Sequence, residues 1–103
     1  MPLAEPPVDD LLSAVSRDLL VIERFRAMDQ STWPMTMQPL LFRAAGLAAI
    51  VADRVEGEQR RSMIELSQSI IKIMPPDEQG LPDDAAWLRL AAAHASAVEA
   101  FAR

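Results

Sequence analysis

The chain has 103 residues and a formal net charge of -5, half of its residues are apolar, and it contains no cysteine. This length supports one hydrophobic core, and the lack of cysteine excludes disulfides and thiolate chemistry. The acidic balance disfavours non-specific contact with nucleic acid or with an anionic membrane.

The eight prolines mark the boundaries of the helices that the sequence predicts. Each proline lies at or outside the edge of a segment whose apolar residues recur at helical spacing, and proline is disfavoured inside helices because it lacks an amide donor. Short connections favour antiparallel neighbours. We therefore expect an all-α fold, a small four-helix up-down bundle in which residues 1–103 form one domain and residues 1–6 a flexible N-terminal tail. The expected helices cover residues 8–29, 37–56, 58–74 and 83–102.

The first helix, over residues 8–29, is predicted to begin near Pro7. Asp9 and Asp10 then face the positive end of the helix dipole. Leu20, Val21 and Met28 lie off the predicted buried side of this helix. That side is a stripe with spacings of three and four, made of Val8, Leu11, Leu12, Val15, Leu19, Ile22 and Phe25.

The second helix, over residues 37–56, is predicted to have Thr36 as its N-cap and Pro39 in its first turn. Much of its surface is formed by small residues, which allow another helix to approach closely: Ala45, Gly46, Ala48, Ala49 and Ala52.

Methionine and tryptophan side chains surround the first connection, namely Met28, Trp33, Met35 and Met37. Methionine is flexible and polarisable, and large aromatics often anchor interfaces. Because connections are usually exposed, we predict that these four residues bind another protein. The alternative is that Trp33 closes one end of the bundle.

The third helix, over residues 58–74, is predicted to follow a tight turn at Gly57. A helix that continues through Gly57 is the alternative, because glycine costs only about 1 kcal/mol relative to alanine in a helix. The core-facing stripe of this helix consists of Met63, Leu66, Ile70 and Ile73.

Ile64 and Ile71 lie about half a turn away from that stripe, so the third helix is apolar on two sides. Such a helix is either central in an irregular bundle or part of an interface. We predict self-association, as a two-fold homodimer, through Leu20, Ile64 and Ile71.

Arg60 and Arg61 lie in the first turns of the third helix, where cations oppose the helix dipole by a few tenths of a kcal/mol each. One interpretation is that they pair with Asp53, Glu56 or Glu58 across the Gly57 turn. The other is that they bind an anion or an acidic protein partner.

The fourth helix, over residues 83–102, is predicted to be capped by Asp83 and to place His94 on its apolar side. Phosphotransfer domains built on a histidine are also acidic helical bundles of about this size. A lysine and a glycine usually follow their phosphorylated histidine, whereas Ala97 and Val98 occupy that region here. We therefore interpret His94 as a buried or half-buried packing residue.

Other sites find weaker support in the sequence. Lone acidic pairs on a helix are usually solvated, and no Glu-x-x-His pair is present, so no metal site and no cofactor are expected. The segment 43–55 superficially resembles a helix-turn-helix around Gly46. Its second helix, however, would offer alanines to DNA bases, which makes a dimeric DNA-binding regulator the lesser alternative.

The sequence therefore predicts a non-enzymatic protein-protein interaction or regulatory module, such as an adaptor, inhibitor, antitoxin or chaperone. We expect it to act as a homodimer or as a subunit of a larger complex, without a membrane and without nucleic acid. A small helical enzyme is a lesser alternative. The N-terminus has neither the basic nor the apolar region of a signal peptide, so a soluble, cytoplasmic protein is expected. Nine of the ten cations are arginine, which is typical of GC-rich bacterial or phage genomes.

Overall fold

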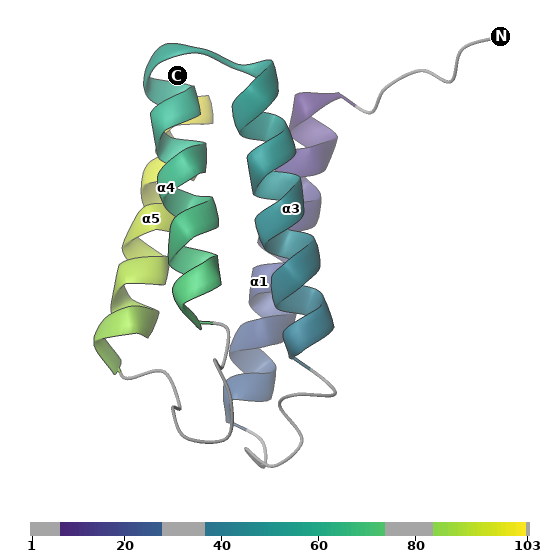
Figure 1. The fold of residues 1–103 in the computed structure, drawn as a ribbon, viewed down its shortest axis with the longest axis vertical. Coiled ribbons are helices and arrows are strands. Elements are labelled where there is room, and N and C mark those ends of the chain that lie inside the picture. Colours follow the sequence, from purple (N-terminus) through teal and green to yellow (C-terminus); the bar gives the residue numbers. More distant parts are fainter. Residues whose placement is uncertain (1–6, 28–36, 74–83, 103) are drawn as a thin grey trace, which may run out of the picture.

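The computed structural model describes residues 7–27, 37–73 and 84–102. These residues form four helices: α1 (Val8–Arg26), α3 (Gln38–Arg54), α4 (Gly57–Ile73) and α5 (Asp84–Ala102). The helices run alternately down and up along one common direction (Figure 1). The predicted all-α four-helix up-down bundle is thus confirmed, whereas the predicted tail at residues 1–6 lies outside the described residues.

Helix α1 begins where the sequence predicts it. Pro7 is its N-cap rather than a residue of its first turn, and the Pro7 carbonyl accepts hydrogen bonds from the amides of Asp10, at 3.0 Å, and Leu11, at 3.2 Å. Asp9 and Asp10 occupy the first turn, where negative charge is favourable. The helix ends at Arg26, before the predicted residue 29, and Ala27 is its C-cap.

Helix α3 starts one residue after Met37, which is its N-cap and offers no side-chain capping bond. The predicted cap Thr36 lies outside the described residues, as does the Asp83 cap predicted for α5. The helix passes through Gly46 without a break. The turn that a helix-turn-helix would need within 43–55 is therefore absent, and that interpretation of the segment is wrong.

The connection between α3 and α4 contains no proline, and the sequence predicts a tight turn there at Gly57. Helix α3 ends at Arg54 because Val55 is extended, and α4 begins at Gly57, whose φ of +66° favours glycine. The alternative of one continuous helix is thus excluded. The resulting connection is short, so α3 and α4 are forced into an antiparallel pair.

The closely packed helix pairs are α1 with α3, α3 with α4, and α4 with α5. Small residues of α3 allow α4 to approach closely, in agreement with the prediction that another helix can pack against them. Ala45 and Ala48 are buried, and the Ser67 hydroxyl donates a 3.1 Å hydrogen bond to the Ala45 carbonyl. The largest fully buried side chains belong to one core, formed by Val15, Ile22, Met37, Leu41, Val51, Met63, Leu66, Ile70 and Ile73.

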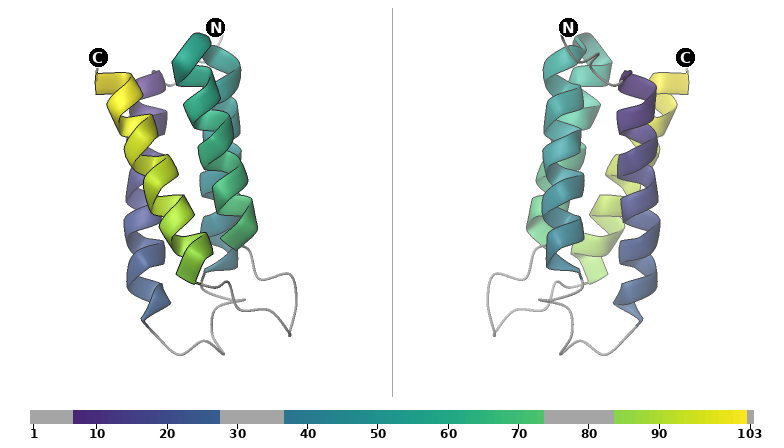
Figure 2. Two further views of the ribbon diagram at one scale, coloured as in Figure 1. Left: turned by 90° about the vertical axis from the view of Figure 1, so that its left-hand side faces the viewer. Right: turned by 90° about the vertical axis from the view of Figure 1, so that its right-hand side faces the viewer.

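Helices α1 and α5 are not among the closely packed pairs and meet through side chains. Figure 2 shows α5 tilted relative to its neighbours. Arg26 of α1 connects the two helices, because it donates a 3.1 Å hydrogen bond to Asp84 of α5 and its guanidinium lies 4.7 Å from the ring centroid of Trp87. The bundle is therefore more open between α1 and α5 than along its other sides. None of the described helices combines the length and the apolar character needed to span a bilayer.

Candidate functional site

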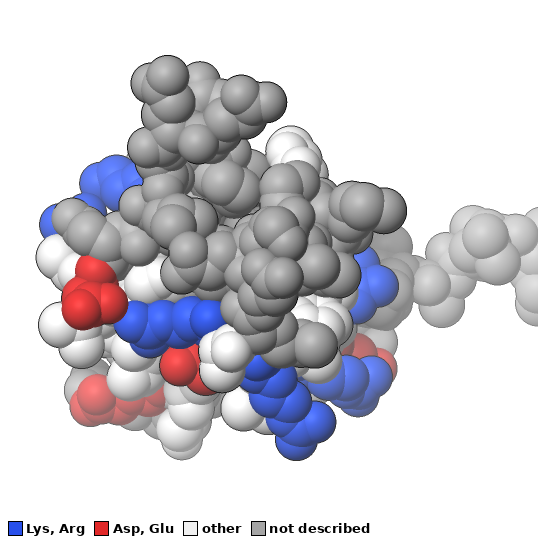
Figure 3. All heavy atoms as spheres, turned by 90° about the horizontal axis from the view of Figure 1, so that it is seen from below, with Lys and Arg blue, Asp and Glu red and all other residues white. Residues whose placement is uncertain are grey.

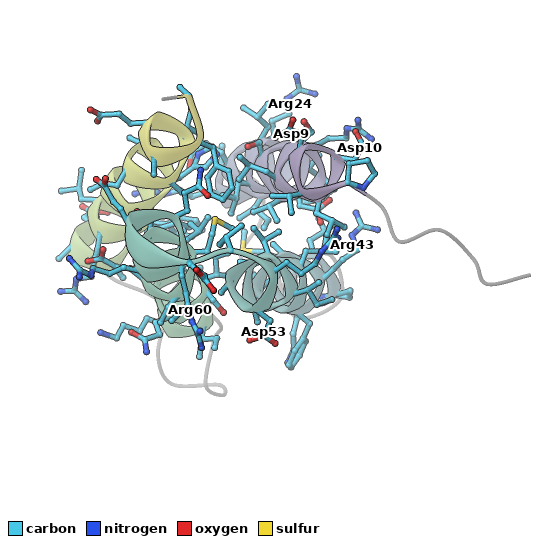
Figure 4. The ribbon with its side chains drawn as sticks, turned by 90° about the horizontal axis from the view of Figure 1, so that it is seen from above. Asp9, Asp10, Arg24, Arg43, Asp53 and Arg60 are labelled. Carbon is cyan, nitrogen blue, oxygen red and sulfur yellow. The ribbon has the colours of Figure 1, made fainter. Side chains whose placement is uncertain are left out.

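Large apolar side chains reach the surface on two opposite sides of the bundle. Viewed from above, α3 and α4 form one side and α1 and α5 form the other (Figure 4). The exposed large apolar residues within the described ranges are Leu20, Phe42, Ile50, Ile64, Ile71, Leu88 and Val98. We name the two surfaces the α3–α4 face and the α1–α5 groove.

The α3–α4 face consists of Phe42 and Ala49 from α3 with Ile64 and Ile71 from α4. In each helix the two residues are seven positions apart and so point the same way. Ala49 and Ile64 line one hollow. Because Ser67 contacts Ala45, the antiparallel register brings Phe42 and Ile71 to the same level of the pair. The result is an apolar seam along two helices, in which the polar side chain of Gln68 also lines the hollow between Ala49 and Ile64.

Ile64 is 41% exposed and Ile71 is 53% exposed, so α4 is not enclosed by the other helices. The alternative of a central α4 is therefore wrong: this helix packs between α3 and α5 and leaves one side open. The predicted second apolar side of the helix is a surface of this protein.

Charged side chains of both signs lie at the upper end of this seam. Arg60 and Arg61 line a shallow hollow beside Ile64, and Asp53 lies at the same edge of the bundle as Arg60 (Figure 4). Neither arginine forms an ion pair within residues 7–27, 37–73 and 84–102. The predicted pairing of these arginines with Asp53, Glu56 or Glu58 is thus not found there.

The α1–α5 groove lies on the opposite side of the bundle. Leu20 and Trp87 are among the residues that line it, and Leu20 is 65% exposed. The three residues predicted for self-association therefore do not share one surface, because Leu20 faces away from Ile64 and Ile71. Helical periodicity places each residue correctly on its own helix but does not reveal which neighbouring helix lies beside it.

His94 lies in this groove and is half-buried, as the sequence predicts. Its Nε2 and the Ser16 hydroxyl oxygen are 2.9 Å apart and share a hydrogen bond, which links α5 to α1. Burial lowers the pKa of His94 below its ordinary value. The ring is therefore neutral at pH 7 and joins the two loosely packed helices.

A serine beside a histidine is also the basic pair of nucleophilic catalysis. That chemistry needs a third group that orients the histidine and amides that bind the oxyanion. Within the described residues no acid is bonded to the other ring nitrogen of His94. Ser16 lies in the middle of α1, where the backbone amides are used by the helix. This arrangement suits a structural link.

The lowered pKa of His94 predicts a specific pH dependence of stability. The unfolded chain, with a histidine pKa of about 6.5, binds a proton more readily than the folded protein. The contribution of neutral His94 is present above that value and is lost as the pH falls through the lower folded pKa. We expect the wild type to lose more stability than His94→Gln between about pH 7.5 and about pH 5.

Urea unfolding of both proteins at the two pH values measures this difference. His94 is the only histidine in the chain, so the variant removes the only side chain that ordinarily titrates near neutral pH. Equal losses in the two proteins would show that protonation of His94 does not oppose folding.

Asp18 and Arg43 form a pair that the sequence did not reveal. Asp18 is 3% exposed and accepts a 2.8 Å hydrogen bond at Oδ2 from Arg43 Nε, while Arg43 Nη2 donates to Oδ1. This hydrogen bond raises the pKa of Arg43, and the side chain of Arg43 points between α1 and α3 (Figure 4). The sequence signal that indicates a buried, paired acid is the position of Asp18 inside the apolar stripe of the first helix, three residues after Val15.

No protein-family model, curated protein or solved structure matches this chain. The function must therefore be argued from the surfaces themselves. Within the described ranges, no group of three or more histidine and acidic side chains is arranged to hold a metal ion.

The predicted partner-binding residues have different outcomes. Met37 is fully buried in the core, so its assignment to a binding surface is wrong; its position at the start of α3 turns it inward. Met28, Trp33 and Met35 lie outside the described residues. Arg60 and Arg61 are exposed beside the α3–α4 face.

Proposed function

We propose that this protein is a non-enzymatic interaction module that acts as a two-fold homodimer through the α3–α4 face. The observation that carries this proposal is the exposed seam of Phe42, Ala49, Ile64 and Ile71 along two closely packed helices. Exposed large apolar side chains that group on one face are characteristic of interfaces. The acidic, cysteine-free composition favours a cytoplasmic location.

The pattern along the seam suggests how two copies meet. In a two-fold interface the same patch serves both copies, so it needs features that complement each other within one patch. An axis parallel to the helices places α3 of one protomer against α4 of its partner. The bulky Phe42 then lies at the level of an isoleucine, and the small Ala49 leaves room for one.

The charges at the upper end of the face fit the same arrangement. Asp53 comes from α3 and Arg60 from α4, and they lie at one edge of the bundle (Figure 4). Within the described residues neither has an ion-pair partner of its own. The proposed axis brings Asp53 of each protomer toward Arg60 of the other, where each charge gains an opposite partner.

Charge exchange tests this arrangement. We expect Asp53→Arg and Arg60→Asp to weaken the dimer when each is introduced alone, because each brings like charges together. We expect the double variant Asp53→Arg/Arg60→Asp to restore it. Sedimentation equilibrium over a range of protein concentrations gives the dissociation constant of each protein.

Ile64→Lys/Ile71→Lys should give a monomer, whereas Leu20→Lys on the opposite side should leave the dimer intact. Circular dichroism of each variant confirms that the helices are retained. A wild type that is monomeric at every accessible concentration would refute the homodimer. Failure of the double exchange to restore a lost dimer would refute the orientation of the two copies.

A further inference from the structure

The α1–α5 groove has the dimensions of a site for side chains of another protein. Its upper hollow has a volume of about 160 Å³ and lies between Leu19, Ile22, Trp87 and Leu90, with His94 along its length, and a lower hollow of about 490 Å³ adjoins it. Pockets that hold small organic ligands cover most of the surface of the ligand. Both hollows of the groove are instead open to solvent, which suits apolar side chains that project from another protein.

The rims of the groove carry the two most exposed large apolar side chains in the described residues. Leu20 of α1 is 65% exposed, and Leu88 of α5 is 72% exposed. Leu88 lines the lower hollow, which shares Glu23, Trp87 and Ala91 with the upper hollow. Val98 lies two turns after Ala91 on the same side of α5 and is 45% exposed. Exposed apolar side chains thus occur along the length of the groove, with His94 among them.

The charges that line the groove are acidic at the rim. Glu23 and Asp84 have side chains that are 64% and 94% exposed. The lining cation Arg26 is 33% exposed and is already paired with both acids and stacked on Trp87. Figure 3 shows positive and negative side chains side by side at this lower end of the bundle. Arg24 points outward from α1 rather than into the groove (Figure 4).

We propose that the α1–α5 groove binds a basic amphipathic helix of another protein. Such a helix places apolar residues at positions i, i+3 or i+4, and i+7 between α1 and α5, with the first of them over Trp87. Lysine or arginine at its flanks meets Glu23 and Asp84. The groove from Asp84 to His94 spans about 15 Å, which corresponds to about three helical turns of the partner.

Two other occupants fit the groove less well. A second copy of this chain that docks with its helices parallel would bring its own Glu23 and Asp84 against the same two acids, and like charges across an interface are costly. A second copy that docks antiparallel would be revealed by loss of the dimer in Leu20→Lys. A peptide that binds by adding a β-strand needs a free sheet edge for backbone hydrogen bonds, and both walls of the groove are helices whose backbone groups bond internally. A helix with apolar and basic sides satisfies both the shape and the charge.

The test uses the full chain and three fluorescein-labelled peptides of about 15 residues. The first has leucines on one helical face and lysines on its flanks, the second has glutamates in place of the lysines, and the third is a scrambled form of the first. Fluorescence anisotropy measures the affinity of each. We expect saturable binding of the lysine peptide and binding weaker by at least about tenfold for the other two.

Protein variants locate the binding site. We expect Leu20→Ser/Leu88→Ser to weaken binding of the lysine peptide by at least about tenfold, and Glu23→Lys to weaken it as well. The matched control Ile64→Ser/Ile71→Ser, on the opposite face, should bind as the wild type does. Because the replaced leucines are exposed, the fold should be retained, and thermal unfolding followed by circular dichroism verifies this.

Equal affinity for the lysine and glutamate peptides would overturn the proposal, as would unchanged binding by Leu20→Ser/Leu88→Ser. Absence of binding at peptide concentrations up to about 1 mM, where the binding free energy is only about 4 kcal/mol, would also overturn it. The outcome is independent of the homodimer, because Asp53→Arg should bind the lysine peptide as tightly as the wild type does. A failure here is thus distinguishable from a failure of the α3–α4 interface.

Discussion

Ile70→Ala is expected to lower the free energy of unfolding by about 2–5 kcal/mol, which is a large fraction of the 5–15 kcal/mol typical of a domain. Ile70 is fully buried in the core formed by all four helices. Removing most of its side chain forfeits the transfer free energy of the lost carbons and leaves a cavity that close packing cannot fill. Urea unfolding, evaluated by linear extrapolation, measures the loss.

The adjacent residue provides a matched control. Ile71→Ala makes the same chemical change one position later, where the side chain is 53% exposed. At a protein concentration low enough for the monomer, we expect a change within about 0.5 kcal/mol. Equal losses at the two positions would mean that Ile71 is as buried as Ile70 and that α4 is rotated about its own axis. A loss for Ile71→Ala that grows with protein concentration would instead support its place in the dimer interface.

Arg43→Met is expected to destabilise the protein more strongly than any change at a solvated arginine. The substitution keeps an unbranched side chain about as long as the aliphatic part of arginine and removes both hydrogen bonds to Asp18. Asp18 is then left as a buried carboxylate without its cation, and an unpaired buried charge is costly. Arg89→Met, on the exposed side of α5, is the control and should unfold close to the wild-type temperature.

The double variant Asp18→Asn/Arg43→Met isolates the cause. Asparagine carries no charge, so Asp18→Asn removes most of the free-energy cost of burying an unpaired carboxylate. We therefore expect the double variant to be more stable than Arg43→Met alone. Thermal unfolding of the wild type, both single variants and the double variant gives this comparison. If the double variant were the least stable of the four, the pair would contribute through packing rather than through charge. Arg43→Lys should not substitute fully, because lysine lacks the planar fork that contacts both oxygens.

The helices, and the inward sides of α1 and α4, could be predicted because they depend on local chemistry. Prolines lie outside helices or in their first turn, and apolar residues at helical spacing identify the side that packs. Ile64 and Ile71 were recognised as surplus apolar residues for this reason, and the turn at Gly57 followed from the only glycine between two periodic segments. The small residues of α3 likewise predicted that another helix approaches closely, and the structure shows that this helix is α4, whose Ser67 donates a hydrogen bond to the Ala45 carbonyl.

The relationships between helices could not be predicted from one sequence. Periodicity gives the direction of a side chain about its own helix axis but not the helix that lies in that direction. Leu20 was therefore grouped with residues of the opposite face, and Asp18 was not connected with Arg43. Met37 was assigned to the surface because methionines cluster near it in the sequence, yet the start of α3 turns it into the core.

The placement of the two apolar surfaces on opposite sides of the bundle determines the valency of the proposed assembly. A dimer that buries its α3–α4 faces would carry two α1–α5 grooves, both pointing outward and away from each other. A partner with a single helix would occupy the grooves independently. A partner that is itself dimeric, or that carries two such helices on a long linker, would gain avidity or be cross-linked into larger assemblies. The monomeric Ile64→Lys/Ile71→Lys variant would retain binding to one helix and lose this cross-linking.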